Sequence, residues 1–143
     1  MLIQTKYLGE IKITQDEIIT FPYGLLGFED YHDFIILDVP GNSHFKFLQD
    51  INHSYLTFLL INPWDFFTGY EIDIPDENLA KIGIDPKADG ELEVYNIVTM
   101  GSSFNESTAN LLAPIIVNPT DKKGKQFILN DSIYTTKHKL FPE

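Results

Sequence analysis

Short runs of alternating hydrophobic and polar residues make up most of this chain, and turn-forming residues separate them. Residues 10–14 and 70–74 alternate strictly with a period of two, which is typical of strands with one buried face. Residues 55–61 are almost continuously apolar, which predicts a central strand covered on both faces. The same reasoning predicts strands over 2–7, 18–21, 34–39, 45–49, 91–100, 111–117 and 126–129.

One segment has the pattern of a helix. Pro75 precedes a turn that is rich in acids, Leu79 and Ile82 share its apolar face, and Gly83 follows it. About ten short strands without a βαβ rhythm indicate an all-β, mainly antiparallel fold, either a barrel or a sandwich. We predict a small β-barrel-like domain with one short helix. Because no linker divides the chain, residues 1–143 are expected to form a single domain.

A corner is predicted at residues 21–29, where the sequence reads Phe-Pro-Tyr-Gly-Leu-Leu-Gly-Phe-Glu. Pro22 fixes its own φ angle, and Gly24 and Gly27 can adopt backbone angles that other residues avoid. A glycine-rich turn can also bind phosphate, but this one lacks a following lysine with serine or threonine and opens no helix. We therefore expect a structural corner whose apolar side chains pack against the core, namely Leu25, Leu26 and Phe28.

Charge is distributed unevenly along the chain. The 143 residues include 21 acids and ten lysines, for a net charge of −11. Between Ile13 and Asp121 there are 18 acids and three lysines, a net of −15, whereas from Lys122 onward five lysines and two acids give +3. An acidic surface repels nucleic acid phosphates and attracts basic proteins, so direct nucleic acid binding is not expected and a basic protein partner is favoured. The other interpretation is that the acids only confer solubility.

Composition also limits chemistry and location. The absence of cysteine excludes disulfides and thiolate catalysis, and no apolar run approaches the roughly 20 residues of a membrane span. No membrane association is expected, and the cytoplasm is the expected location. The four histidines are far apart in the sequence. Residues 30–33 (Asp-Tyr-His-Asp) are more typical of an exposed polar loop than of a metal site. We therefore predict no enzymatic activity, no metal and no cofactor.

Aromatic residues flanked by acids are the best candidates for a binding site. Phe66 and Phe67 are neighbours, so they cannot both enter one core if the chain is extended there. Hydrophobic anchors rimmed with acids suit a basic, amphipathic partner. The alternative is that one phenylalanine packs in the barrel while the other covers the short helix. The predicted partner-binding residues are Asp65, Phe66, Phe67, Tyr70, Glu71, Asp73, Phe104 and Glu106.

Several motifs together resemble a known family, the FliW flagellar assembly factors. The corner at 21–29 is similar to that family's N-terminal signature, and Tyr134 fits its C-terminal strand and tail. Lys137 stands where an arginine is frequent in the family. The remaining matches lie at 45–49, 61–63, 96–98, 108–118 and 126–129, in the family's order and spacing.

The resemblance implies a small β-barrel-like protein without enzymatic activity, expected to be monomeric alone. FliW proteins bind the RNA-binding translational repressor CsrA and also flagellin. Flagellin occupies FliW until it is exported, and the released FliW then inhibits CsrA. From the acidic charge we expect CsrA antagonism by repulsion of RNA phosphates, with Glu71 and Asp73 near the contact. For flagellin we expect an amphipathic helix to lie on an apolar surface, and Phe66 and Phe104 are each a candidate anchor for it.

Two other functions remain open from the residues. A β-barrel could bind a small ligand in its interior, although Phe34, Phe45, Phe47 and Phe58 are expected to fill that space. A hydrolase that uses an acid pair with His32 would require carboxylates to converge on that histidine.

Overall fold

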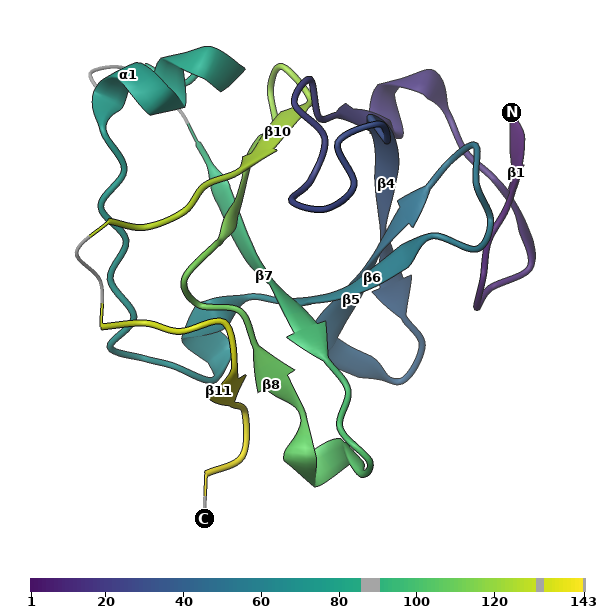
Figure 1. Cartoon of the computed structure of the whole chain (residues 1–143). Coiled ribbons are helices and arrows are strands. Elements are labelled where there is room, and N and C mark those ends of the chain that lie inside the picture. Colours follow the sequence, from purple (N-terminus) through teal and green to yellow (C-terminus); the bar gives the residue numbers. More distant parts are fainter. Residues whose placement is uncertain (86–90, 131–132, 143) are drawn as a thin grey trace.

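Seven strands pair in a closed ring in the computed structural model, which describes residues 1–85, 91–130 and 133–142 (Figure 1). The ring runs β7-β6-β5-β4-β3-β10-β9, and β9 pairs back onto β7. Every pairing is antiparallel except the contact of β3 with β10. The predicted all-β, mainly antiparallel barrel is therefore confirmed. The ring strands are β3 (Ile19–Thr20), β4 (Asp33–Val39), β5 (Asn42–Asp50), β6 (Thr57–Ile61), β7 (Glu93–Thr99), β9 (Ile115–Asn118) and β10 (Lys123–Gln126).

Two further pairs of strands lie outside the ring. Strands β1 (Leu2–Gln4) and β2 (Glu10–Lys12) form a separate antiparallel hairpin. Strand β8 (Thr108–Ala109) pairs with the end of β7, and β11 (His138–Lys139) pairs with β8. Figure 1 shows β8 and β11 side by side below the ring, on the side where the chain ends. Strand β7 is thus shared between the barrel and this extension.

The barrel interior is filled with large apolar side chains. Phe21, Phe34, Leu48, Leu60 and Ile115 are each fully buried and belong to one hydrophobic cluster. The prediction that phenylalanines occupy the interior holds for Phe34 and for Phe58, which packs against the same cluster. It is wrong for two others: Phe45 belongs to a different cluster, and Phe47 stacks on Tyr7 at a ring distance of 5.1 Å.

Four short 3-10 helices and one α-helix occur in the described residues. The predicted helix is present as α1 (Asp76–Leu79), continued by η3 (Ala80–Ile82) and ended by Gly83 in the left-handed region at φ 77°. No helix in the described part of the chain combines the length and apolar character needed to cross a bilayer. The other helices are η1 (Gln15–Glu17), η2 (Pro63–Asp65) and η4 (Phe104–Glu106).

Some predicted strand boundaries are wrong. Residues 70–74 form no strand, although Ile72 and Ile74 pack against the clusters beneath them. Their alternation reports burial on one side, which does not require a ladder partner. The predicted strand over 126–129 lies earlier, at β10, and the one over 111–117 begins only at Ile115. Strands β8 and β11, with two residues each, have no detectable period.

The predicted corner is confirmed in its backbone and corrected in one side chain. Gly24 and Gly27 have φ angles of 68° and 83°, and Leu25 forms an isolated bridge with Phe28. Leu25 is 2% exposed, but Leu26 is 48% exposed, so the prediction that Leu26 packs is wrong. Residues 26 and 27 form the tip of the tight turn between the bridged residues, which directs Leu26 outward. Phe28 is partly exposed, with its ring edge-on to Phe58 at 5.1 Å.

Candidate partner-binding surface

Four phenylalanines from distant parts of the sequence meet beside β8, and we call them the aromatic cluster (Phe45, Phe66, Phe104 and Phe141). Phe45 lies 5.7 Å from Phe66 and 5.6 Å from Phe104 between ring centroids. Phe141 lies 5.9 Å from Phe66 and 5.2 Å from Phe104. Phe45 is buried, whereas Phe104 is 43% exposed. The structure thus brings the two predicted anchors, Phe66 and Phe104, to one surface.

Short 3-10 turns hold both anchors in place. In η2 the side chain of Asn62 accepts a hydrogen bond from the Trp64 N–H at 3.0 Å, and Pro63 supplies a fixed φ at the first position. The Phe66 N–H donates to the Pro63 carbonyl, which places Phe66 directly after this turn. In η4 the Ser107 N–H donates to the Phe104 carbonyl. Each anchor therefore lies in or directly after a hydrogen-bonded 3-10 turn.

Two of the four predicted acids, Asp65 and Glu106, border the aromatic cluster. The carboxylate of Asp65 lies 3.3 Å from His44 Nδ1, and the His44 ring contacts Phe66 at 5.9 Å. Glu106 is exposed on η4, two residues from Phe104, and its carboxylate accepts a hydrogen bond from the Ser102 hydroxyl. The result is an apolar centre with carboxylates at its rim, which suits a basic, amphipathic segment.

The C-terminal segment, residues 134–141, lies across this region. Leu140 is 4% exposed within the hydrophobic cluster that includes Phe45, and its N–H donates to the Ser107 carbonyl at 3.1 Å. The ring of His138 lies 6.2 Å from Phe67, which is half-buried. Phe141 was not among the predicted partner-binding residues. The apolar pair at positions 140 and 141 after the basic residues was the available signal.

Tyr70 lies in the core and not on the exposed surface. It is 4% exposed, and its hydroxyl donates to the Leu111 carbonyl at 2.6 Å and accepts a bond from Asn96 Nδ2 at 3.3 Å. Burial raises the pKa of Tyr70 to about 12, and the neighbouring Tyr134 adds to the shift. Tyr70 therefore supports the surface from beneath.

Glu71 and Asp73 do not border the aromatic cluster. They line a separate groove of about 490 Å³, together with Ile72, Leu129 and Ile133. Both acids are exposed. The Glu71 N–H donates to the Tyr134 hydroxyl at 2.9 Å, so the C-terminal segment connects this groove with the aromatic cluster. The eight predicted residues are therefore divided between the cluster, the groove and the core.

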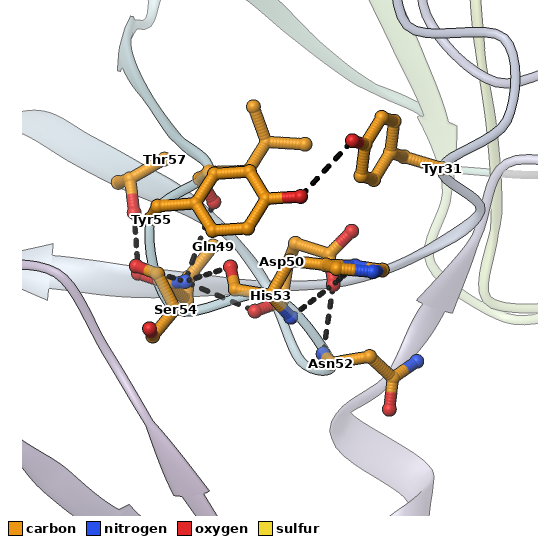
Figure 2. Close-up of polar contacts among 9 residues, drawn as sticks. Tyr31, Gln49, Asp50, Asn52, His53, Ser54, Tyr55 and Thr57 are labelled. Carbon is orange, nitrogen blue, oxygen red and sulfur yellow. Dashed lines mark hydrogen bonds and ion pairs between the residues drawn. The ribbon is translucent and has the colours of Figure 1, made fainter.

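A buried polar cluster at the turn between β5 and β6 is structural (Figure 2). The carboxylate of Asp50, 1% exposed, accepts bonds from the backbone N–H groups of Asn52 and His53 at 2.7 and 2.9 Å. The side-chain amide nitrogen of Gln49 lies within 3.3 Å of four turn carbonyls. These side chains are hydrogen-bond partners of the backbone groups of a tight turn, and no pattern in the sequence pointed to them.

Within the described residues, the histidines that pair with a carboxylate are His44 and His53, and not His32. His32 Nδ1 lies 2.8 Å from the Phe21 carbonyl, so this histidine is engaged by the corner backbone. Among residues 1–85, 91–130 and 133–142 no group of three or more histidines and acids is placed to hold a metal ion. The hydrolase hypothesis therefore has no support from the position of His32.

Comparison with known proteins gives one consistent relationship. A family model described as FliW protein matches residues 2–140. The chain is 45% identical over 140 residues to Flagellar assembly factor FliW of Bacillus pumilus, and 42% identical over 140 residues to that of Bacillus subtilis, with 98% of this chain and 96% of each relative covered. A crystal structure of the flagellar assembly factor FliW superimposes with a TM-score of 0.92 at 39% identity, covering 99% of this chain and 98% of the other.

Proposed function

This chain belongs to the FliW family of flagellar assembly factors, and from that membership we propose that it is a non-enzymatic, protein-binding antagonist of the translational repressor CsrA. We propose that it also binds flagellin, and that the two associations exclude one another. Flagellin then occupies the protein until it is exported, after which the freed protein inhibits CsrA. Flagellin level is thereby coupled to flagellin translation.

The aromatic cluster with its acidic rim is the observation that supports a protein partner. Phe66 and Phe104 lie on one surface, and Asp65 and Glu106 flank them. An amphipathic helix of flagellin would place apolar residues against the two phenylalanines and basic residues beside the carboxylates. Burial of aromatic anchors supplies affinity, while the rim charges supply orientation and association rate.

Electrostatic repulsion is the proposed means of CsrA antagonism. The chain carries a net charge of −11, and Glu71 and Asp73 are exposed along the groove beside Tyr134. A domain of this charge docked beside a basic RNA-binding groove would oppose RNA phosphates at short range without entering the groove itself. The same charge disfavours direct binding of nucleic acid by this chain. We place the protein in the cytoplasm as a monomer when it is unbound.

Competition between the two partners tests this function. Purified chain is mixed with CsrA and a labelled RNA that CsrA binds, and flagellin is then titrated into the mixture. We expect the chain to release RNA from CsrA and flagellin to restore RNA binding. A stable complex of the chain with both proteins would contradict the partner switch, and undisturbed RNA binding would contradict the antagonism.

A further inference from the structure

The C-terminal segment lies on the surface that the partner needs. We propose that residues 134–141 are an exchangeable occupant of the aromatic cluster, and that a basic, aromatic-bearing segment of the partner protein replaces them when it binds. This inference rests on the proposed function, because it specifies how flagellin gains access to Phe66 and Phe104.

The contacts of this segment are those expected of a partner. Phe141 contacts both Phe66 and Phe104, at 5.9 and 5.2 Å between ring centroids. His138 contacts Phe67 at 6.2 Å. Three of the predicted partner-binding residues, Phe66, Phe67 and Phe104, are thus already in contact with another part of the same chain. A partner segment cannot pack fully against the two anchors while Phe141 covers them.

The chemistry of the segment is also that of the expected partner. It carries Lys137, His138 and Lys139 before the apolar pair Leu140 and Phe141, and it belongs to the part of the chain with net charge +3. In the described ranges, however, neither Lys137 nor Lys139 forms an ion pair with a carboxylate. A partner that matched the apolar contacts and also reached the rim carboxylates would bind this surface better than the segment does.

Few backbone contacts hold the segment in place. Strand β11 pairs with β8 through two residue pairs, His138 with Ala109 and Lys139 with Thr108. The Thr135 carbonyl accepts bonds from the N–H groups of Leu111 and Leu112, both at 3.1 Å. By comparison, five residue pairs join β5 to β6 in the barrel. The segment is therefore the part of this surface that can open without loss of the barrel.

Leu140 explains why exchange requires a replacement. This side chain is 4% exposed and packs in the hydrophobic cluster that includes Phe45 and Ala109. Release of the segment alone would expose that cluster to water, so the released state is a minor one. The apparent affinity for the partner is then the intrinsic affinity multiplied by the fraction of molecules whose C-terminal segment is released. If about one molecule in 100 is released, the apparent affinity falls about 100-fold.

A disulfide staple between β8 and β11 tests the exchange. Thr108 and Lys139 face each other, and the Leu140 N–H bond to the Ser107 carbonyl makes them a non-hydrogen-bonded pair, whose Cα atoms lie about 4.5 Å apart. That distance permits a disulfide, and the chain has no other cysteine. We expect Thr108→Cys/Lys139→Cys to bind flagellin at least about tenfold more weakly when oxidised than when reduced. Equal binding in both states would overturn the exchange.

A second staple provides the matched control. Gln4 and Glu10 form the equivalent pair in the β1–β2 hairpin, where the Thr5 N–H donates to the Gly9 carbonyl, and both residues are exposed. Gln4→Cys/Glu10→Cys is expected to bind flagellin equally in both redox states. If oxidation weakens binding in the control as much as in the β8–β11 staple, the loss is not due to the C-terminal segment and the exchange is rejected.

Amide hydrogen exchange decides the inference without any partner. The N–H groups of Leu111, Leu112 and Leu140 bond to or from the segment, so we expect them to exchange at least tenfold faster than the Leu60 N–H in the reduced protein. Oxidation of the β8–β11 staple should slow them. Exchange as slow as that of Leu60 before oxidation would overturn the inference. If no form binds flagellin, the proposed function fails, while this measurement still decides whether the segment opens.

Discussion

The backbone N–H of Leu26 donates a hydrogen bond to the side-chain Oε1 of Gln126, 100 residues further along the chain, at 3.0 Å. The amide nitrogen of the same Gln126 side chain donates to the Ala113 carbonyl at 3.1 Å. Gln126 is 7% exposed, so these bonds form largely away from water. One side chain thus joins the corner at residues 21–29 to β10 and to the segment that precedes β9.

Replacement of Gln126 by leucine should destabilise the protein. The N–H of Leu26 and the carbonyl of Ala113 would lose their partner, and an unpaired buried polar group costs about 1–3 kcal/mol. We expect the free energy of unfolding in urea to fall by about 2 kcal/mol or more. Ile128→Ala, at an exposed neighbouring position, should change it by less than about 0.5 kcal/mol. Equal effects of the two substitutions would show that the bond contributes little.

The two corner glycines should differ in their tolerance of alanine. A Cβ at Gly24 would lie 2.5 Å from the Glu29 Cα, whereas a Cβ at Gly27 would meet nothing within 4 Å. Both residues have positive φ, so Gly27→Ala should cost about 1–2 kcal/mol of unfolding free energy from backbone strain alone. Gly24→Ala adds a clash with backbone atoms and should cost at least about 1 kcal/mol more. Thermal or urea unfolding of the two variants makes the comparison.

Alkaline pH should weaken the fold through Tyr70. Burial raises the pKa of Tyr70 from 10.0 to about 12, so the folded state favours the neutral phenol more than the unfolded state does. This stabilisation is complete below pH 10 and is lost as the pH rises toward 12. Tyr95 has the same shift and the same sign, with burial as its main cause. In urea unfolding, Tyr70→Phe should therefore reduce the loss of stability between pH 10 and 12 without abolishing it. An unchanged pH dependence would contradict the assignment to Tyr70.

Phe104 is expected to be an anchor for flagellin. Its side chain is 43% exposed and its ring packs on Phe45 and Phe141, so truncation should remove contact area without opening the barrel. We expect Phe104→Ala to weaken flagellin binding by more than about 1 kcal/mol in titration calorimetry, which is about fivefold in Kd. Leu2→Ala, an exposed apolar truncation in the β1–β2 hairpin, is the control. Unchanged affinity in a folded Phe104→Ala protein would remove this residue from the site.

Neutral substitutions of Glu71 and Asp73 should reduce RNA exclusion more than CsrA binding. Glu71→Gln/Asp73→Asn removes two exposed negative charges while it preserves side-chain size. Added salt should have a similar effect, because the Debye length is about 8 Å at physiological ionic strength. RNA displacement from CsrA measures exclusion, and Asp30→Asn/Asp38→Asn removes the same charge elsewhere. If both double variants exclude RNA as well as the wild type does, repulsion at these acids is not the mechanism.

The sequence predicted those features that depend on local periodicity. Strands β4 and β6 and the helix before Gly83 lie where the pattern placed them. The pattern carries no information about which strand pairs with which, so the closure of β9 onto β7 was not predictable. For the same reason Phe66 and Phe104 were proposed separately, and their common neighbour Phe141 was missed. Tyr70 was placed on the surface because acids flank it, although its alternation with Glu71 and Asp73 puts it on the same, buried face as Ile72.

Strand β7 divides its pairing along its length: Glu93, Val94 and Tyr95 pair with β9, whereas Val98 and Thr99 pair with β8. The residues of β7 that close the barrel onto β9 are consequently different from the residues that pair with β8. Exposed positions in residues 134–141 can therefore change without altering any strand pairing of the ring. A lineage of such proteins can therefore follow changes in its partner's sequence while it keeps its scaffold intact.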